Sequence, residues 1–459
     1  MPFDLWVYLA VEDYNGISCH EGLAIRATRA GGMIMKSGIS SGARAASKFI
    51  MGFGLVSMLM DIVYEGALSV QGPLLASLGA SAATVGLISG LGEATSLAGR
   101  LVTGPLADRV GRYWLFAIAG YAITALAVPA MGLAGSVVTV GILVVVERMG
   151  KAVRTPSRDA MISHASAAVG RGKGFALHEL MDQIGATLGP LIVSGILFAT
   201  GGEYGRALGV MVLPGAAAIA VLAWLRHRNP DPARFEQGAA GSDDSVAVPN
   251  GAADPSASAA RTADSVATSA ASVAQALPRQ FWAYSLFCGL SLIGVATFAV
   301  LSFHMVGIGV DESFVPVMYA IAMLVDGLSA LATGALYDRM GPKTLVVLPV
   351  LSACIPLFAY GDSFAPVAVG VVLWGLTTGV QESTMRAYVA DLLPSDQRAT
   401  GYGYFALVTG VGTMLGGAIS GFMYGSFGPA AIRVFALGIE AVALLALMRL
   451  IRRRSVKTR

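Results

Sequence analysis

Long apolar runs separated by short polar breaks dominate the chain from Phe49 onward. A bilayer core of about 30 Å needs roughly 20 apolar residues per helix, and hydropathy and periodicity give about twelve such runs. Runs such as VTVGILVVVERMG are continuous and do not alternate as membrane β-strands do. The pattern therefore predicts an all-α polytopic fold, with spans beginning near Phe49, Ala82, Tyr113, Val137, Gly174, Leu208, Arg279, Ser313, Leu345, Phe364, Ala399 and Ala431.

Composition supports a membrane protein. The chain is 55% hydrophobic and only 13% charged, which is too few charged residues to cover a soluble domain of 459 residues. The bilayer is therefore the expected solvent and lipid the expected surroundings. The net charge of +3 is interpreted as a topological signal, and no nucleic-acid partner is indicated.

Basic residues indicate the orientation. If both termini are cytoplasmic, most of them fall in inner segments, whereas the predicted outer connections hold little beyond Arg206 and Arg433. By the positive-inside rule we expect a multi-pass protein of the cell membrane with both termini inside. The inner set comprises Arg109, Arg112, Arg171, Lys173, Arg226, Arg228, Arg339, Lys343, Arg398 and the terminal IRRRSVKTR.

Five segments are expected along the chain. The stretch 229–278, rich in Ala, Ser, Asp, Gly and Pro, lacks the apolar mass to fold and is predicted to be a disordered cytoplasmic linker. It separates a six-helix bundle over 49–228 from a second over 279–452, which a basic tail, 453–459, follows. Residues 1–48 match neither half and are either a cytoplasmic extension or sequence upstream of a true start at Met33 or Met35.

The two halves resemble each other. GPLADRVGR at Gly104 recurs as GALYDRMGP at Gly334, and IGATLGPL near Gly185 recurs as VGTMLGGA near Gly412. Duplicated halves with a binding site between them are typical of transporters.

The stretch GPLADRVGRYW reads physically as a tight cytoplasmic turn. Gly104 and Gly111 allow close approach or a positive φ, and Pro105 is not expected to continue the preceding helix. Asp108 is expected to accept from backbone N–H groups at a helix start, and Arg109 and Arg112 follow the positive-inside bias. A capped loop does not explain why the same spacing recurs half a chain later.

Here the sequence resembles the major facilitator superfamily, whose characteristic motif lies between the second and third helices, with a degraded copy between the eighth and ninth. The resemblance covers about Phe49 to Arg452 and implies a gating latch in this turn. Pro342 replaces the terminal basic residue of the second copy, which puts a latch there in doubt. The residues matching the motif are Gly104, Asp108, Arg109, Gly111 and Arg112, and then Gly334, Asp338, Arg339 and Gly341.

The fifth predicted helix carries a second motif, Gly185, Gly189 and Pro190. Small residues at this spacing let two helices touch closely, and proline bends one of them. The motif is similar to one enriched among proton-driven exporters of the family, although Val193 and Ser194 replace its trailing glycines. Ordinary helix packing is the alternative interpretation.

Ionisable residues at membrane depth need a partner, a wet cavity or a task, because each costs about 2.5–3.5 kcal/mol. The resemblance implies that helices one, four, seven and ten line the cavity. This favours Asp61, Glu65, Arg148, Glu382 and Arg386 over Glu93 and Asp326, which could instead form hydrogen bonds between helices. The candidates for substrate or proton contact are Asp61, Glu65, Glu93, Arg148, Asp326, Glu382 and Arg386.

Other charged residues have plainer interpretations. We expect salt bridges at the cytoplasmic helix ends from Arg154, Arg158, Asp159 and Glu179, and a packed or rim position for His304. Asp61 and Glu65 lie at i, i+4 on one helix face. Either could bind a proton, with Arg148 competing for the same carboxylate, or they could form a structural ion pair with Arg148.

The sequence predicts a secondary active transporter of a small solute, which alternates access around a mid-membrane site, is proton-coupled and favours export. The alternatives are a uniporter or importer, or a non-transporting sensor or assembly factor on the same scaffold. No enzyme, cofactor or metal site is indicated, since no phosphate-binding loop occurs and Cys19, Cys288 and Cys354 have no metal-ligand spacing. A monomer is the expectation that the resemblance supplies.

Overall fold

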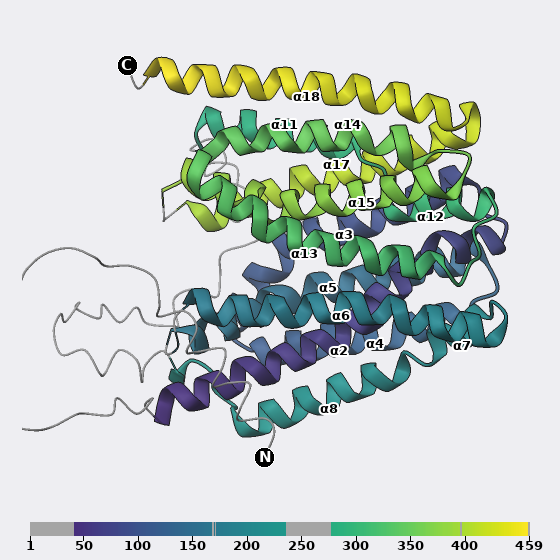
Figure 1. The fold of residues 1–459 in the computed structure, drawn as a ribbon. Helices are drawn as coiled ribbons and strands as arrows, with labels where there is room; N and C mark the ends of the chain where they lie inside the picture. Colours follow the sequence, from purple (N-terminus) through teal and green to yellow (C-terminus); the bar gives the residue numbers. More distant parts are fainter. Residues whose placement is uncertain (1–40, 168, 170, 236–276, 395–396, 458–459) are drawn as a thin grey trace, which may run out of the picture. The chain divides into compact units, whose positions relative to one another are not determined.

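The computed structural model describes residues 41–167, 169, 171–235, 277–394 and 397–457, which include no β-strand (Figure 1). The expected extension up to residue 40 and most of the linker lie outside the described residues. The N-half consists of α2 (Ser41–Ser77), α3 (Ala82–Val110), α4 (Tyr113–Gly132), α5 (Val137–Ser166), α6 (Arg171–Thr200), α7 (Tyr204–Gly209) and α8 (Val212–Arg228).

The C-half begins after the linker. It consists of α11 (Arg279–Gly294), α12 (Phe298–Gly307), α13 (Val315–Met340), the 3₁₀ helix η2 (Gly341–Val346), α14 (Val347–Ala359), α15 (Phe364–Val380), the π-helical turn η3 (Gln381–Met385), α16 (Arg386–Leu392), α17 (Arg398–Phe427) and α18 (Pro429–Lys457). The prediction of an all-α fold is confirmed.

Nine helical segments of the described chain are long and apolar enough to cross a membrane. One of them, Val315–Ala359, contains both α13 and α14. Two more helices, α3 with 29 residues and α5 with 30, are not among these nine but are long enough for a bilayer at about 1.5 Å per residue. With these, the described residues hold the twelve long segments that the sequence predicts.

Several helix starts fall where the sequence places them. α3, α4, α5, α11 and α15 begin at Ala82, Tyr113, Val137, Arg279 and Phe364. At α3 and α5 a serine fixes the start, because Ser81 accepts from the N–H of Thr84 and Ser136 from that of Thr139.

The first helix is longer than expected. α2 begins at Ser41, so residues 41–48, which the sequence assigned to the extension, form its first turns. Hydropathy placed the start at Phe49 because the preceding residues are small or charged, and such residues are helix-compatible without being apolar. The remaining segment boundaries predicted from the sequence stay predictions.

The repeated glycine motifs pack equivalent helices in the two halves. A Cβ atom at Gly185 or Gly189 would collide with the carbonyl oxygens of Met58 and Ile62, so α6 lies directly on the backbone of α2. In the C-half, Gly412 and Gly416 of VGTMLGGA bring α17 equally close to α11, against the carbonyl oxygens of Gly289 and Leu292. The fifth helix of each half thus packs on the first, as expected of a duplication.

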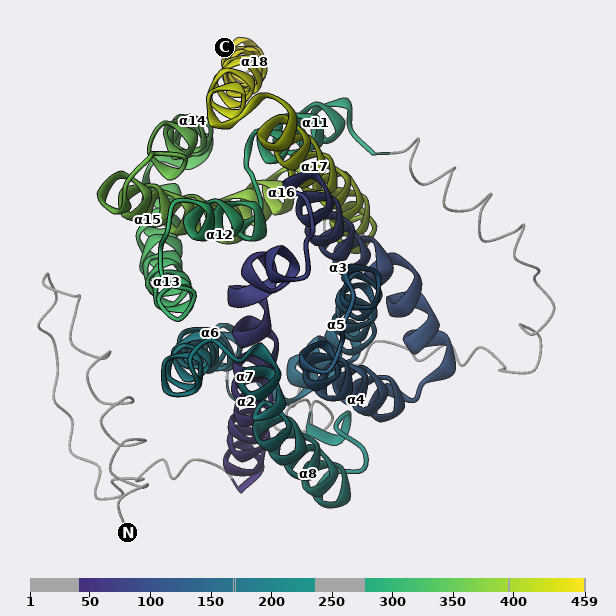
Figure 2. The same cartoon turned by 90° about the vertical axis from the view of Figure 1, so that its right-hand side faces the viewer.

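The main helix pairs that join the two halves are α3 with α17, α6 with α13, and α2 with α12, and α3 with α12 and α2 with α13 also touch. Figure 2 looks along the helices and shows α2–α8 grouped on one side of these contacts and α11–α18 on the other. The α3–α17 pair is close because Gly86 and Gly417 face each other's backbone.

The motif GPLADRVGR, Gly104 to Arg112, is mostly helix, which corrects the expectation of a turn. Gly104 to Val110 form the last turns of α3, with Pro105 inside the helix. Only Gly111 and Arg112 connect to α4, and Gly111 has φ 66° and donates its N–H to the carbonyl of Ala107. Pro105 has no N–H to donate to the carbonyl of Leu101, four residues earlier, so the helix continues with that one hydrogen bond missing.

Asp108 has a different partner from the one expected. It accepts a hydrogen bond from the hydroxyl of Tyr113 at 3.0 Å, not from backbone N–H groups at a helix start. The second copy is built alike: Gly334, Asp338 and Arg339 lie in the last turns of α13, and Gly341 follows with φ 61°.

We call the end of the bundle where α3 ends the motif end, and the other end the opposite end.

Candidate functional site

A cavity of about 1070 Å³ lies between the two halves. All seven candidate residues line it: Asp61, Glu65, Glu93, Arg148, Asp326, Glu382 and Arg386. They come from α2, α3, α5, α13, η3 and α16, so the folding of both halves brings together residues that lie far apart in the sequence. Whether they bind substrate or protons stays a prediction.

Asp61 and Glu65 lie one helical turn apart on the cavity face of α2 and are 6% and 8% exposed. Among the described residues, no Lys or Arg nitrogen lies within ion-pair distance of either carboxylate. Glu65 instead accepts a hydrogen bond from the hydroxyl of Tyr319, on α13 of the other half, at 2.5 Å. A carboxylate in the first half is therefore tied to the second.

Arg148 is held by other carboxylates than the sequence suggested. It is 2% exposed, and its guanidinium lies 3.0 Å from Glu93 on α3 and 3.4 Å from Glu147. Among the described residues, Arg148 therefore pairs with neither Asp61 nor Glu65 in this conformation. The neighbouring cation, Lys151, donates to the hydroxyl of Tyr64 at 2.8 Å.

A polar network continues from the cavity wall into the N-half. Arg158 pairs with Asp159 at 2.9 Å and with Asp182 at 3.5 Å, as expected of a salt bridge. Beyond it, His178 lies 3.4 Å from Asp182 and 2.9 Å from the hydroxyl of Ser57. The network thus links a residue facing the cavity to buried groups between α2, α5 and α6.

The sequence suggested a salt bridge at a helix end for Arg154, but no carboxylate of the described residues lies within ion-pair distance of it. It is 2% exposed, donates to Thr124 at 2.7 Å and lies over the ring of Tyr121, 5.0 Å from its centroid. The attraction between the guanidinium and the aromatic face offsets part of the cost of burying this charge.

The C-half contributes an acidic wall. Asp326, 3% exposed, accepts from the side-chain amide of Gln183 on α6 at 3.3 Å, which is a second link between the halves. Glu382 and Arg386 face the cavity with exposed side chains. Glu382 lies in the π-helical turn η3; such turns are frequent at functional sites, because they reorient side chains within a helix.

Contacts beyond the cavity link the two halves at the opposite end. The hydroxyl of Tyr204 donates to Glu312 at 2.6 Å, and that of Ser194 donates to the carbonyl of Ser313 at 2.6 Å. Asp311 orders this loop by accepting from the hydroxyl and the N–H of Ser313. These hydrogen bonds lower the pKa of the Asp311 carboxyl below its ordinary value, because they stabilise its ionised form.

The cavity extends from mid-helix toward the motif end. Its lining on α5 runs from Arg148 to Asp159, mostly in the half of the helix nearer that end. Glu382 and Arg386, in η3 and α16, also lie toward the motif end of their helical segment. The exposed side chains of Glu179, Glu382 and Arg386 agree with access from this side.

Sequence reasoning missed several residues of the site. Tyr64 could have been found, because it lies three positions after Asp61 and therefore near the same helix face. Tyr319 and Gln183 carry no local signal, since each is defined by a partner in the other half. His304, in contrast, is packed as predicted, between Tyr424 and the carbonyl of Gly361.

An all-helical polytopic bundle with a charged cavity between two duplicated halves defines a membrane transporter. A family model described as Major Facilitator Superfamily matches residues 49–307 and 294–459. The chain belongs to the Major Facilitator Superfamily. It is accordingly a secondary transporter of a small-molecule substrate and not an enzyme, as the sequence predicted.

Relatives agree with this assignment. An uncharacterized protein of Mycobacterium tuberculosis is 46% identical over 419 residues, covering 91% of this chain and 97% of that protein. The quinolone resistance protein NorA of Staphylococcus aureus is 26% identical over 142 residues, covering 30% of this chain and 36% of NorA. A crystal structure of a mutant of the nucleoside transporter NupG superposes with a TM-score of 0.69 at 15% identity, covering 88% of this chain and 99% of that one.

Proposed function

We propose that this transporter couples solute movement to protons, and that Asp61 and Glu65 carry the proton. The observation behind the proposal is that two carboxyl groups face the central cavity, nearly buried, with no cation in ion-pair distance among the described residues. An ionised carboxylate at membrane depth costs about 2.5–3.5 kcal/mol. Taking up a proton removes this cost, so these groups are suited to bind and release one.

The bond between Tyr319 and Glu65 supports a link between protonation and movement. While Glu65 is ionised, its hydrogen bond from Tyr319 is charge-assisted, and such bonds are roughly twice as strong as neutral ones. Protonation weakens this contact between α2 and α13. In our proposal the two halves then separate near the cavity and rock toward the alternative conformation.

The remaining candidates have proposed roles around this step. Arg148, held here by Glu93 and Glu147, moves to the α2 carboxylates in another conformation and displaces the proton. Glu382 and Arg386, whose side chains are exposed in the cavity, contact the substrate.

The motif at the end of α3 is proposed as the gate. Asp108, Arg109 and Arg112 are exposed at the motif end, on a helix that packs against α17 of the other half. Charges there can break and re-form contacts as the halves move. Asp338 and Arg339 occupy the equivalent end of α13.

We further propose export as the direction of transport, from the Gly185–Pro190 motif and the limited likeness to NorA, a quinolone resistance protein. The proposal also includes the segment boundaries 49–228, 229–278 and 279–452. It further includes a monomeric state and a location in the cell membrane with both termini cytoplasmic. A cytoplasmic motif end would make the present conformation inward-open.

The test uses the full-length protein in proteoliposomes with a pH-sensitive dye inside, screened against a panel of solutes. A proton crossing is worth about 2.3 kcal/mol per 100 mV, enough for roughly a fiftyfold solute gradient. We expect a solute-dependent pH change that Asp61→Asn or Glu65→Gln abolishes. Glu203→Gln, which removes an exposed carboxylate that pairs with Arg206, is the control and should transport normally.

Retained uphill transport in both α2 variants would refute the role of these carboxylates. Solute flux without any pH change, in the wild-type protein, would refute proton coupling itself and indicate a uniporter.

A further inference from the structure

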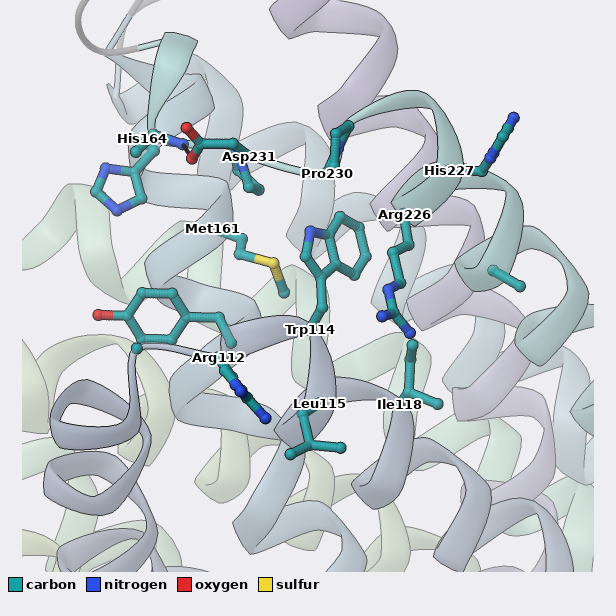
Figure 3. Close-up of a pocket in the computed structure, with 15 residues that line it drawn as sticks. Arg112, Trp114, Leu115, Ile118, Met161, His164, Arg226, His227, Pro230 and Asp231 are labelled. Carbon is teal, nitrogen blue, oxygen red and sulfur yellow. Dashed lines mark hydrogen bonds between the residues drawn. The ribbon is translucent and has the colours of Figure 1, made fainter.

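A second pocket, of about 860 Å³, lies at the motif end of the N-half and is separate from the central cavity (Figure 3). Its walls are the start of α4, the end of α5, the end of α8 and the segment Pro230–Ala233. α4 and α8 contribute no residue to the central cavity. Figure 2 shows both helices on the outside of the bundle, where a bilayer would surround them.

The depth of this pocket corresponds to a membrane boundary. α4 begins at Tyr113 and α8 ends at Arg228, so the pocket lies where two apolar spans meet a charged segment. Leu115, which is 55% exposed, and Ile118 form an apolar wall. A ligand bound here would contact polar groups at one end and an apolar helix face at the other.

The polar end of the pocket is basic. Arg112 and Arg226 are both exposed, and Figure 3 shows them on the two sides of Trp114. The acid among the lining residues, Asp231, accepts from the N–H of Ala233 at 3.1 Å. Two arginines around one site favour an anion with several oxygens, such as a phosphate.

Trp114 adds a donor without an acceptor. The residue is 8% exposed and lines the pocket, and its indole nitrogen has no hydrogen-bond partner among the described residues. A buried indole N–H usually finds a partner. The orphan group therefore marks an incompletely partnered donor in the wall of this pocket.

We propose that this pocket binds an anionic phospholipid, with its phosphate between Arg112 and Arg226 and an acyl chain along Leu115 and Ile118. Basic pockets between helices at the membrane surface bind acidic headgroups, and the apolar wall distinguishes a lipid from free phosphate. Because Arg112 ends the gating motif of α3, an occupied pocket would hold that residue and make the gate sensitive to lipid.

The experiment is native mass spectrometry of the full-length protein with phosphatidylglycerol, together with titration of a short-chain phosphatidylglycerol followed by thermal stabilisation. We expect one tightly bound phosphatidylglycerol. At about 1 kcal/mol per arginine, the double variant Arg112→Gln/Arg226→Gln should weaken binding about thirtyfold.

Two further variants separate this site from general charge or folding effects. Ala223→Trp fills the pocket without removing a charge and should also weaken binding. Arg228→Gln removes a cation that lies over Trp224, 5.7 Å from the ring centroid and outside the pocket, and should leave binding unchanged.

The proposal is overturned if phosphatidylcholine binds as tightly as phosphatidylglycerol, or if the double variant and Ala223→Trp bind like the wild type. Equal affinity for the soluble glycerophosphoglycerol headgroup would overturn the assignment to a lipid and indicate a phosphate site.

Discussion

Replacing Arg148 with methionine should destabilise the fold through the carboxylate it leaves behind. Arg148 is 2% exposed and Glu147 is 4% exposed, and the two lie 3.4 Å apart. The second carboxylate oxygen of Glu147 already has no hydrogen-bond partner among the described residues. Glu93, the other partner of Arg148, has a side chain that is 31% exposed and can be hydrated from the cavity.

The size of the effect follows from these burials. Removing one partner of a buried ion pair costs about 3–5 kcal/mol, because the remaining charge is uncompensated. In the double variant Glu147→Gln/Arg148→Met, the remaining group is a neutral amide, whose unsatisfied burial costs about 1–3 kcal/mol. We therefore expect the double variant to be about 2 kcal/mol more stable than Arg148→Met alone.

The assay is the free energy of unfolding in mixed micelles of dodecylmaltoside with increasing dodecyl sulfate. Arg206→Met serves as the control, because its ion pair with Glu203 at 2.7 Å has side chains that are 67% and 52% exposed. Exposed pairs contribute about 0–1 kcal/mol. An Arg148→Met variant within about 1 kcal/mol of the wild type, or a double variant less stable than the single, would show that the reasoning is wrong.

Two further predictions concern the contacts of α2. Gly189→Ala places a Cβ against the carbonyl of Ile62 and should cost about 1–3 kcal/mol of unfolding free energy. Gly195→Ala in the same helix meets nothing within 4 Å and should be neutral in the same assay. Equal effects of the two variants would contradict the close packing. Tyr319→Phe removes the donor to Glu65 and should slow proton-coupled transport about tenfold. Tyr360→Phe, the control, removes a buried hydroxyl with no partner among the described residues and should transport normally. Unchanged transport rates for both variants would argue against the link between the halves.

Sequence alone determined the class of fold and much of its layout. In a bilayer each span must satisfy its own backbone hydrogen bonds, so an apolar run of sufficient length is already a helix. For that reason the starts of α3, α4 and α5 could be predicted. The repeated glycine and charge motifs revealed the duplication, since equivalent helices need equivalent small residues where they touch.

Tertiary structure decided which charges meet. Tyr319 and Glu65 are 254 positions apart, and no local pattern links them. Arg148 could have paired with either α2 carboxylate, yet the packing of α3 against α5 brings Glu93 to it. A charged side chain at membrane depth pairs with whatever the neighbouring helix presents, and helix packing, not sequence spacing, sets that neighbour.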